Sequence, residues 1–106
     1  MRAVVTTSTD ERQALERLGQ TLKLARLRRN LSQNEFAERM GVSRLTVVAL
    51  EQGKPGVSIG ALLKALTVLG YTERLGELLA SDPIGDSLDL TEGRRRAGAR
   101  NDVADF

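Results

Sequence analysis

The sequence predicts an all-α protein of five helices, and three observations support this fold class. Apolar residues make up 41% of the 106 residues while aromatic residues make up only 3%, so the core must consist of aliphatic side chains, as is typical of helical bundles. Apolar positions recur at spacings of three and four residues. Serines precede several of these stretches and glycines follow them, as capping residues do at the two ends of a helix.

The first predicted helix covers residues 11–29, and its apolar side carries the following residues: Leu15, Leu18, Leu22, Ala25 and Arg26. An arginine on a side that faces the core needs a partner, because an unpaired buried charge is strongly unfavourable. Leu24 and Leu27 fall on the opposite side of this helix. They are either isolated exposed leucines or a small contact surface.

Two short helices around a tight turn follow, at residues 32–40 and 43–52. Ser32 and Glu35 form an S-x-x-E capping box at the start of the first. Its apolar stripe and the glycine that ends it are Phe36, Ala37, Met40 and Gly41. The second begins at Ser43, buries Val47 and Leu50 on one side, and ends at Gly53.

The last two predicted helices cover residues 58–69 and 72–81. Ser58 caps the first of them, Gly70 ends it, and its predicted core stripe is Ile59, Leu62, Leu63, Leu66 and Leu69. Thr72 caps the other, in which Leu75, Leu78 and Leu79 share one side. These three leucines either close the core of the monomer or contact a second copy of the chain.

The chain is therefore interpreted as one folded domain, residues 11–81, between a flexible arm, residues 1–10, and a flexible tail, residues 82–106. Residues 1–81 carry twelve Lys or Arg against eight Asp or Glu, and residues 82–106 carry four against six. A modestly basic domain with a mildly acidic tail is compatible with nucleic-acid binding. The tail contains scattered apolar residues and could fold onto a partner.

Several classes of function are disfavoured. The chain has no cysteine and no histidine, which excludes disulfides, thiol nucleophiles, imidazole bases and ordinary zinc sites. No acid–base pair, phosphate-binding loop or cofactor motif is recognisable, so we expect no catalytic residue, no metal, no cofactor and no enzymatic activity. No signal peptide or membrane span is apparent, and the expected location is the cytoplasm.

The pair of helices around the turn resembles the helix-turn-helix of phage-repressor-like DNA-binding proteins, the XRE or Cro/C1 class. The matching residues are Leu31, Gln33, Ala37, Gly41, Val42, Ser43, Val47, Leu50, Glu51 and Gly53. The resemblance extends from Leu18 to about Tyr71. It implies a phage-repressor-like five-helix domain, double-stranded DNA as a partner, and a structural salt bridge between Arg26 and Glu51.

The predicted DNA-reading surface is the side of residues 43–52 that points away from Val47 and Leu50. Arg44 is the principal candidate, because its guanidinium can pair with guanine O6 and N7. Leu45 and Val48 offer methyl contacts to thymine, and Ser43 could reach a base edge or a phosphate. The resemblance adds phosphate contacts by Gln33, Gln52 and Lys54, the first of which also braces the recognition helix in relatives. The alternative for Arg44 is a solvated surface arginine. Leu45 and Val48 are alternatively surface residues without a specific role, or residues that pack against a second subunit.

One recognition helix reads few base pairs, so useful specificity requires a homodimer on a near-palindromic operator. Leu75, Leu78 and Leu79 are the candidate dimer contacts. Arg2 in a minor groove, or residues 3–5 as a strand against a second copy, are further possibilities for the arm.

The chain as a whole resembles HipB-like antitoxins, and this resemblance implies a protein that represses its own operon and binds a HipA-like kinase toxin. The same DNA-reading residues fit a stand-alone phage-type or chromosomal repressor. A third interpretation is an interaction module whose fold no longer reads DNA.

Overall fold

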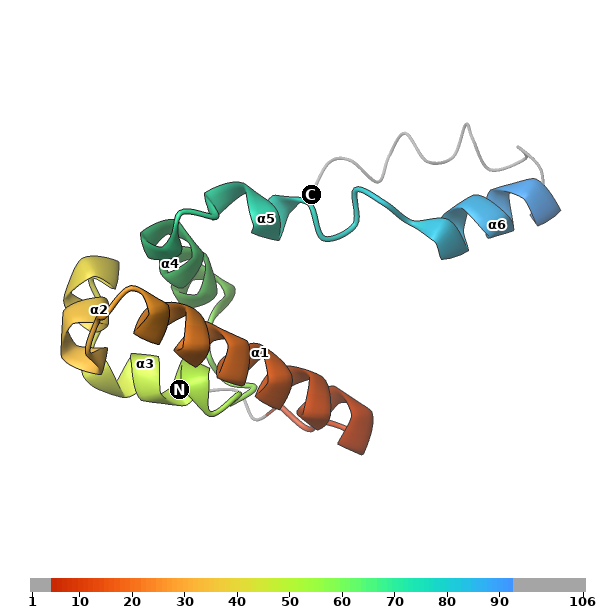
Figure 1. Ribbon diagram of the computed structural model, residues 1–106. Coiled ribbons are helices and arrows are strands. Elements are labelled where there is room, and N and C mark those ends of the chain that lie inside the picture. The colour runs from red at the N-terminus through yellow and green to blue at the C-terminus, as the bar shows by residue number, and fades with distance from the viewer. Residues whose placement is uncertain (1–4, 93–106) are drawn as a thin grey trace. The chain divides into compact units, whose positions relative to one another are not determined.

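The computed structural model describes residues 5–92, and these residues form six α-helices and no strand. The helices are α1 (Thr9–Arg28), α2 (Gln33–Met40), α3 (Arg44–Glu51), α4 (Ile59–Leu69), α5 (Thr72–Gly76) and α6 (Pro83–Glu92) (Figure 1). The predicted all-α class is confirmed, whereas the predicted number of helices was one too low. The chain divides into two compact units between Leu75 and Gly76. The predictions for Arg2, for residues 3–4 and for the arginine-rich end of the tail concern positions outside the described residues.

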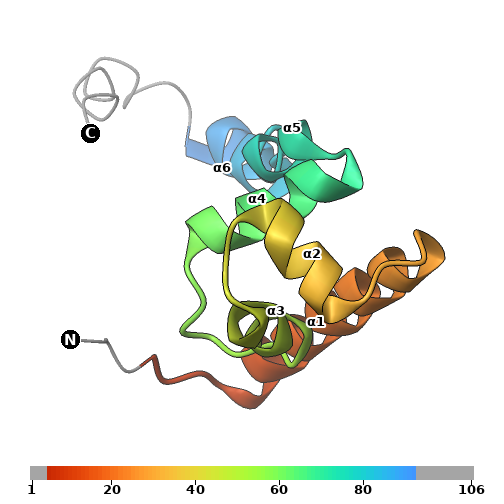
Figure 2. The ribbon, with the colours of Figure 1, turned by 90° about the vertical axis from the view of Figure 1, so that its left-hand side faces the viewer.

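The first unit is built around an apolar core to which α1, α2, α3 and α4 contribute, and its largest fully buried side chains are the aromatic Phe36 and the aliphatic Val47. The buried core residues are Leu22, Leu31, Phe36, Ala37, Met40, Val47, Leu50, Ala65 and Leu69. Helix α3 packs against both α1 and α2, and α2 packs in addition against α4 (Figure 2). The short helices α2 and α3 owe their stability to this packing, since isolated helices of their length are marginal in water.

Reciprocal capping boxes start two of the helices. At α1, the Ser8 hydroxyl accepts a hydrogen bond from the Glu11 backbone N–H, and the Glu11 carboxylate accepts one from the Ser8 N–H at 2.9 Å. Helix α1 therefore begins at Thr9, inside the segment predicted to be a flexible arm. The same arrangement joins Ser32 and Glu35 at α2, as the S-x-x-E pattern predicted.

The core side of α4 differs from the prediction. Ile59, predicted to be buried, is 73% exposed, and Leu63 is 37% exposed, whereas Ala65 is completely buried. The buried side of α4 is centred on Ala65 and Leu69. Leu69 was part of the predicted stripe, and Leu62 and Leu66 from the same stripe are half-buried. Ala65 was missed because the stripe was assigned from the large apolar side chains alone. Leu18 of α1, at 38% exposure, is a third residue predicted in the core that lies at the surface.

The predicted helix at 72–81 ends at Gly76, and a separate helix follows it. Glycine is a poor helix former, and a turn with a hydrogen bond from Ala80 N–H to Glu77 O occupies the next residues. In the second unit, α6 forms where a flexible tail was predicted. The Asp82 carboxylate accepts a hydrogen bond from Gly85 N–H at 2.9 Å. Pro83 occupies the first helical position, where the backbone N–H that proline lacks would have no partner inside the helix. The Asp-Pro pair that was interpreted as the end of a helix is thus the start of one.

Candidate nucleic-acid interface

The turn between α2 and α3 depends on a glycine with left-handed backbone geometry. Gly41 has φ 76° and ψ 30°, which side chains with a Cβ adopt only at a cost. Its N–H donates to Glu38 O, and the N–H of Val42 donates to Ala37 O at 3.0 Å, so the last turn of α2 is closed. The chain then reverses direction and α3 begins immediately after Ser43.

Helix α3 presents one side to the core and the other to solvent. Val47 and Leu50 are buried, whereas Arg44 and Gln52 are exposed and Leu45 is 74% exposed. Val48, predicted to lie on the outer side, is half-buried. The exposed Leu45 side chain is available for a contact with another molecule.

The hydroxyl group of Ser43 is engaged in capping. It accepts a hydrogen bond from the Thr46 N–H at 3.3 Å and lies 3.2 Å from the Thr46 hydroxyl. This places Ser43 at the positive end of α3, where helix N–H groups favour anions. Thr46 was not singled out in the sequence, although its position three residues after a capping serine was a usable signal.

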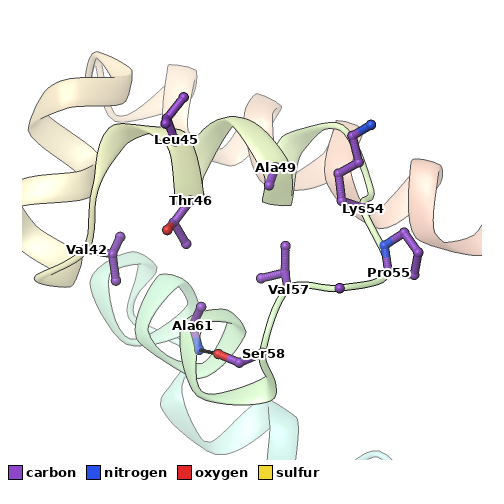
Figure 3. A pocket seen from close by; sticks show the side chains of 10 residues that line it. Val42, Leu45, Thr46, Ala49, Lys54, Pro55, Val57, Ser58 and Ala61 are labelled. Carbon is purple, nitrogen blue, oxygen red and sulfur yellow. Dashed lines mark hydrogen bonds between the residues drawn. The ribbon is translucent and has the colours of Figure 1, made fainter. Parts of the chain in front are cut away.

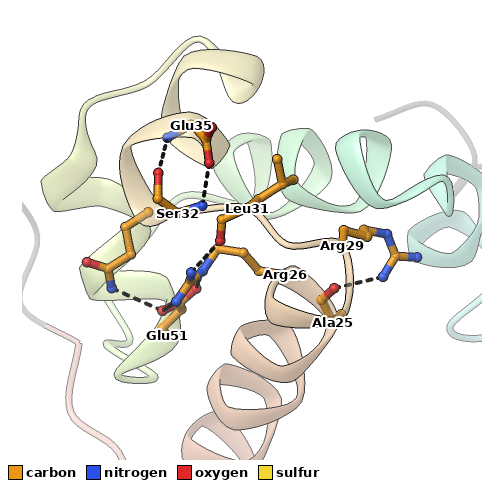
Figure 4. A network of polar contacts seen from close by, with 8 residues as sticks. Ala25, Arg26, Arg29, Leu31, Ser32, Glu35 and Glu51 are labelled. Atoms are coloured by element: carbon orange, nitrogen blue, oxygen red, sulfur yellow. Dashed lines mark hydrogen bonds and ion pairs between the residues drawn. The ribbon is translucent and has the colours of Figure 1, made fainter.

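A buried ion pair joins α1 to the end of α3, between the two residues that the resemblance pairs. Arg26 Nε donates to Glu51 Oε2 at 2.6 Å and Arg26 Nη2 to Glu51 Oε1 at 3.0 Å, with both side chains only 6% exposed (Figure 4). Arg26 Nη1 also donates to Leu31 O at 2.8 Å, in the connection that leads into α2. Gln33 Nε2 donates to the same carboxylate at 3.1 Å. One charge pair therefore ties α1, α2 and α3 together.

The crossing of α1 and α3 is closer than side chains normally allow. A Cβ atom added to Gly19 would lie 2.8 Å from the carbonyl oxygen of Leu50 and closer still to that of Glu51. Both are backbone atoms, so no side-chain movement could relieve the contact. Gly19 therefore sets how closely α3 packs against α1, a role that could not be predicted because a glycine inside a helix carries no periodic signal.

An open cleft of about 740 Å³ lies between α3, the loop that follows it, and the start of α4 (Figure 3). Its lining includes Leu45 and Thr46 of α3, Lys54 of the loop, and Ser58 at the N-terminus of α4. The Ser58 hydroxyl accepts a hydrogen bond from the Ala61 N–H at 3.0 Å and so caps α4. The structure thus brings Leu45 and Lys54, two of the predicted contact residues, to one concave surface.

The candidate dimer residues lie in different surroundings. Leu75 is half-buried in the first unit, whereas Leu78 and Leu79 in the second unit are 72% and 81% exposed. On α1, Leu24 and Leu27, which were considered as a small contact surface, are 48% and 52% exposed.

Two further observations bear on other functions. Within residues 5–92, no three histidine, cysteine or acidic residues gather in a way that could hold a metal ion. No helix among these residues has both the length and the apolar character needed to cross a membrane.

Comparison with known proteins defines the class to which this arrangement belongs. The helix-turn-helix family model matches residues 22–75, about half of the chain, and the matched segment contains α2, the Gly41 turn and α3. The chain belongs to this family, the XRE type of DNA-binding transcriptional regulators.

A relative in Sinorhizobium fredii is described as an uncharacterized HTH-type transcriptional regulator, y4mF. It is 40% identical over 53 residues, which are 50% of this chain and 70% of that protein.

Proposed function

We propose that this protein is a sequence-specific transcriptional repressor that binds a palindromic operator as a homodimer and reads it with α3. The observation that carries the proposal is the exposed outer side of α3, which presents Arg44 and Leu45 to solvent while Val47 and Leu50 on the other side are buried in the core. Arg44 pairs with a guanine, and Leu45 contacts a thymine methyl group. Gln33, Gln52 and Lys54 contact phosphates and fix the register.

Ser43 and Val48 are proposed to make fewer contacts with the bases than Arg44 and Leu45. The Ser43 hydroxyl is committed to the α3 cap, so we assign it to a phosphate rather than to a base edge. Val48 is half-buried and offers part of its side chain to a thymine methyl group.

The experiment starts by selecting a preferred DNA sequence from a random library with the full chain. The affinity of the Arg44→Ala variant for the selected DNA is then measured by fluorescence anisotropy. Loss of a bidentate guanine contact is worth about 1–3 kcal/mol, which corresponds to about 5- to 150-fold weaker binding. Binding to random DNA should change far less. Arg39→Ala, which removes an exposed arginine from α2, is the matched control and should leave the preference for the selected sequence intact. An Arg44→Ala variant with unchanged preference would contradict the assignment.

The proposed dimer uses the exposed leucines after α5. Leu78 and Leu79 expose most of their surface in the single chain, and pairing two copies would remove this apolar surface from water. The double variant Leu78→Ser, Leu79→Ser should sediment as a monomer at concentrations at which the parent chain is dimeric. Its thermal unfolding should hardly change, because neither leucine supports the monomer core. A variant that stays dimeric would move the interface elsewhere.

A second proposed role is that of a HipB-like antitoxin that represses its own operon and binds a HipA-like kinase toxin. The observation that favours a protein partner is α6, in which Ile84 and Leu88 lie one helical turn apart and are 76% and 54% exposed. A helix of ten residues is marginal in water unless a partner covers its apolar side. Co-purification of a kinase-like protein with the full chain, and its loss on Ile84→Ser, Leu88→Ser substitution, would support this role. Operator binding without any retained protein would favour a stand-alone repressor.

A further inference from the structure

The carboxylate of Glu51 does more than neutralise Arg26. It accepts two hydrogen bonds from Arg26 and a third from Gln33 Nε2 at 3.1 Å. Glu51 is the last residue of α3, and Gln33 is the first residue of α2. The bond from Gln33 therefore connects the buried charge pair to a half-buried side chain at the edge of the proposed DNA surface.

The charge on Glu51 decides which way the Gln33 amide points. An ionised carboxylate accepts hydrogen bonds and cannot donate them, so the amide nitrogen must face it and the amide oxygen must face away. The flipped amide would place its oxygen against a carboxylate oxygen. In glutamine side chains without such a neighbour the two orientations are close in energy and interchange. Here the orientation is set before DNA arrives.

The arrangement leaves hydrogen-bonding capacity free at the point where it is needed. Within residues 5–92, the Gln33 side chain forms a hydrogen bond only with Glu51, and this bond uses one of the two amide N–H groups. Gln33 follows the capping residue Ser32, so its side chain lies at the positive end of α2, which attracts phosphate. The second N–H group is a preorganised phosphate donor.

We propose that Glu51 is a positioning residue for DNA binding: its buried carboxylate orients the amide of Gln33 for a phosphate of the operator. The proposal rests on the DNA-binding function proposed above and adds to it. The Arg26–Glu51 pair then has two functions, since it holds α1 against α3 and also prepares one phosphate contact. Substitution of Glu51 should act on DNA affinity through Gln33.

The test is a double-mutant cycle read through the affinity for the selected DNA at one fixed salt concentration. A hydrogen bond to a charged group contributes about 1.5–3 kcal/mol, so Gln33→Ala should weaken binding about 10- to 150-fold per bound protomer. Glu51→Gln should weaken binding as well, and the double variant should bind no more weakly than Gln33→Ala alone. An affinity unaffected by Glu51→Gln, or two effects that simply add, would overturn the proposal.

Glu35→Gln is the matched control for the change of charge. It makes the same acid-to-amide change on the same α2 N-terminus, at an exposed residue that bonds to Ser32 and not to Gln33. Its affinity for the selected DNA should equal that of the parent chain. If the parent chain shows no preference for any DNA sequence, the proposed function fails. If it shows a preference that depends on Arg44 but the cycle is additive, only the role of Glu51 fails.

A measurement on the unsubstituted chain covers the case in which Glu51→Gln does not fold. In a nitrogen-15-labelled sample, the bonded N–H of the Gln33 side chain should resonate downfield and exchange slowly with solvent. The exposed side chains of Gln13 and Gln20 provide internal references in α1. Gln33 amide signals that match these two references would overturn the proposal without any substitution.

Discussion

Substitution of Gly19 by alanine should separate α3 from α1 and destabilise the domain. The added Cβ would lie 2.8 Å from Leu50 O, where an ordinary contact needs at least 3.4 Å, and its other close neighbours are backbone atoms of Glu51. Overpacking costs about 1–3 kcal/mol, and the upper end applies because backbone must move. The better helix propensity of alanine returns about 1 kcal/mol. The expected net loss is about 2 kcal/mol, or a melting temperature about 8–16 °C lower.

Gly60→Ala provides the matched control. Gly60 also lies in a helix, α4, but the nearest atom to an added Cβ is the Ser58 hydroxyl oxygen at 3.8 Å. The same chemical change should therefore raise the stability by up to about 1 kcal/mol. Both variants are compared with the parent chain by thermal circular dichroism and by urea unfolding. A Gly19→Ala variant that melts at or above the temperature of the parent chain would refute the close contact of α1 and α3.

Arg26→Ala leaves the carboxylate of Glu51 buried and without its cation, so the free energy of unfolding measured in urea should fall by about 3–5 kcal/mol. A fall of less than about 1 kcal/mol would mean that the pair behaves like an ion pair at the surface. Hydrogen bonds from the backbone N–H and the side chain of Ser32 lower the pKa of Glu35 below 4.5. The contribution of the ionised Glu35 to stability is therefore present above that pH and is lost as the pH falls through the lowered pKa. The urea midpoint of the Glu35→Gln variant should accordingly fall less on acidification than that of the parent chain. Gly41→Ala should lower the free energy of unfolding by about 1–2 kcal/mol because of the left-handed backbone, since nothing lies within 4 Å of the new methyl group. Gly41→Asn should lower it by less. Equal stability of these two variants and the parent chain in thermal unfolding would contradict a left-handed residue at this turn.

The parts of the structure that depend on local chemistry could be predicted from the sequence. The Ser32–Glu35 capping box, the glycine turn and the burial of Val47 and Leu50 all follow from side chains a few residues apart. The contact between Arg26 and Glu51 bridges 25 positions, and only the resemblance to a known family suggested it.

The features that were missed depend on how closely helices approach one another. Ala65 is completely buried and Gly19 touches backbone because α4 and α1 approach their neighbours closely, and small residues carry no strong periodic signal. The bond from Gln33 to Glu51 requires the folded position of both helices. Helix α6 was missed for a different reason, since Asp82-Pro83 is equally typical of a helix end and a helix start.

The division of α3 into a buried and an open side has a consequence for how this protein can change. The contacts that hold the helix come from Val47, Leu50 and Glu51 and from its own backbone against Gly19. Arg44 and Leu45 project into solvent and support none of these contacts. Substitutions at Arg44 and Leu45 can therefore exchange one operator for another while the scaffold keeps its stability, so new binding preferences are open to evolution or to a designer without refolding the domain.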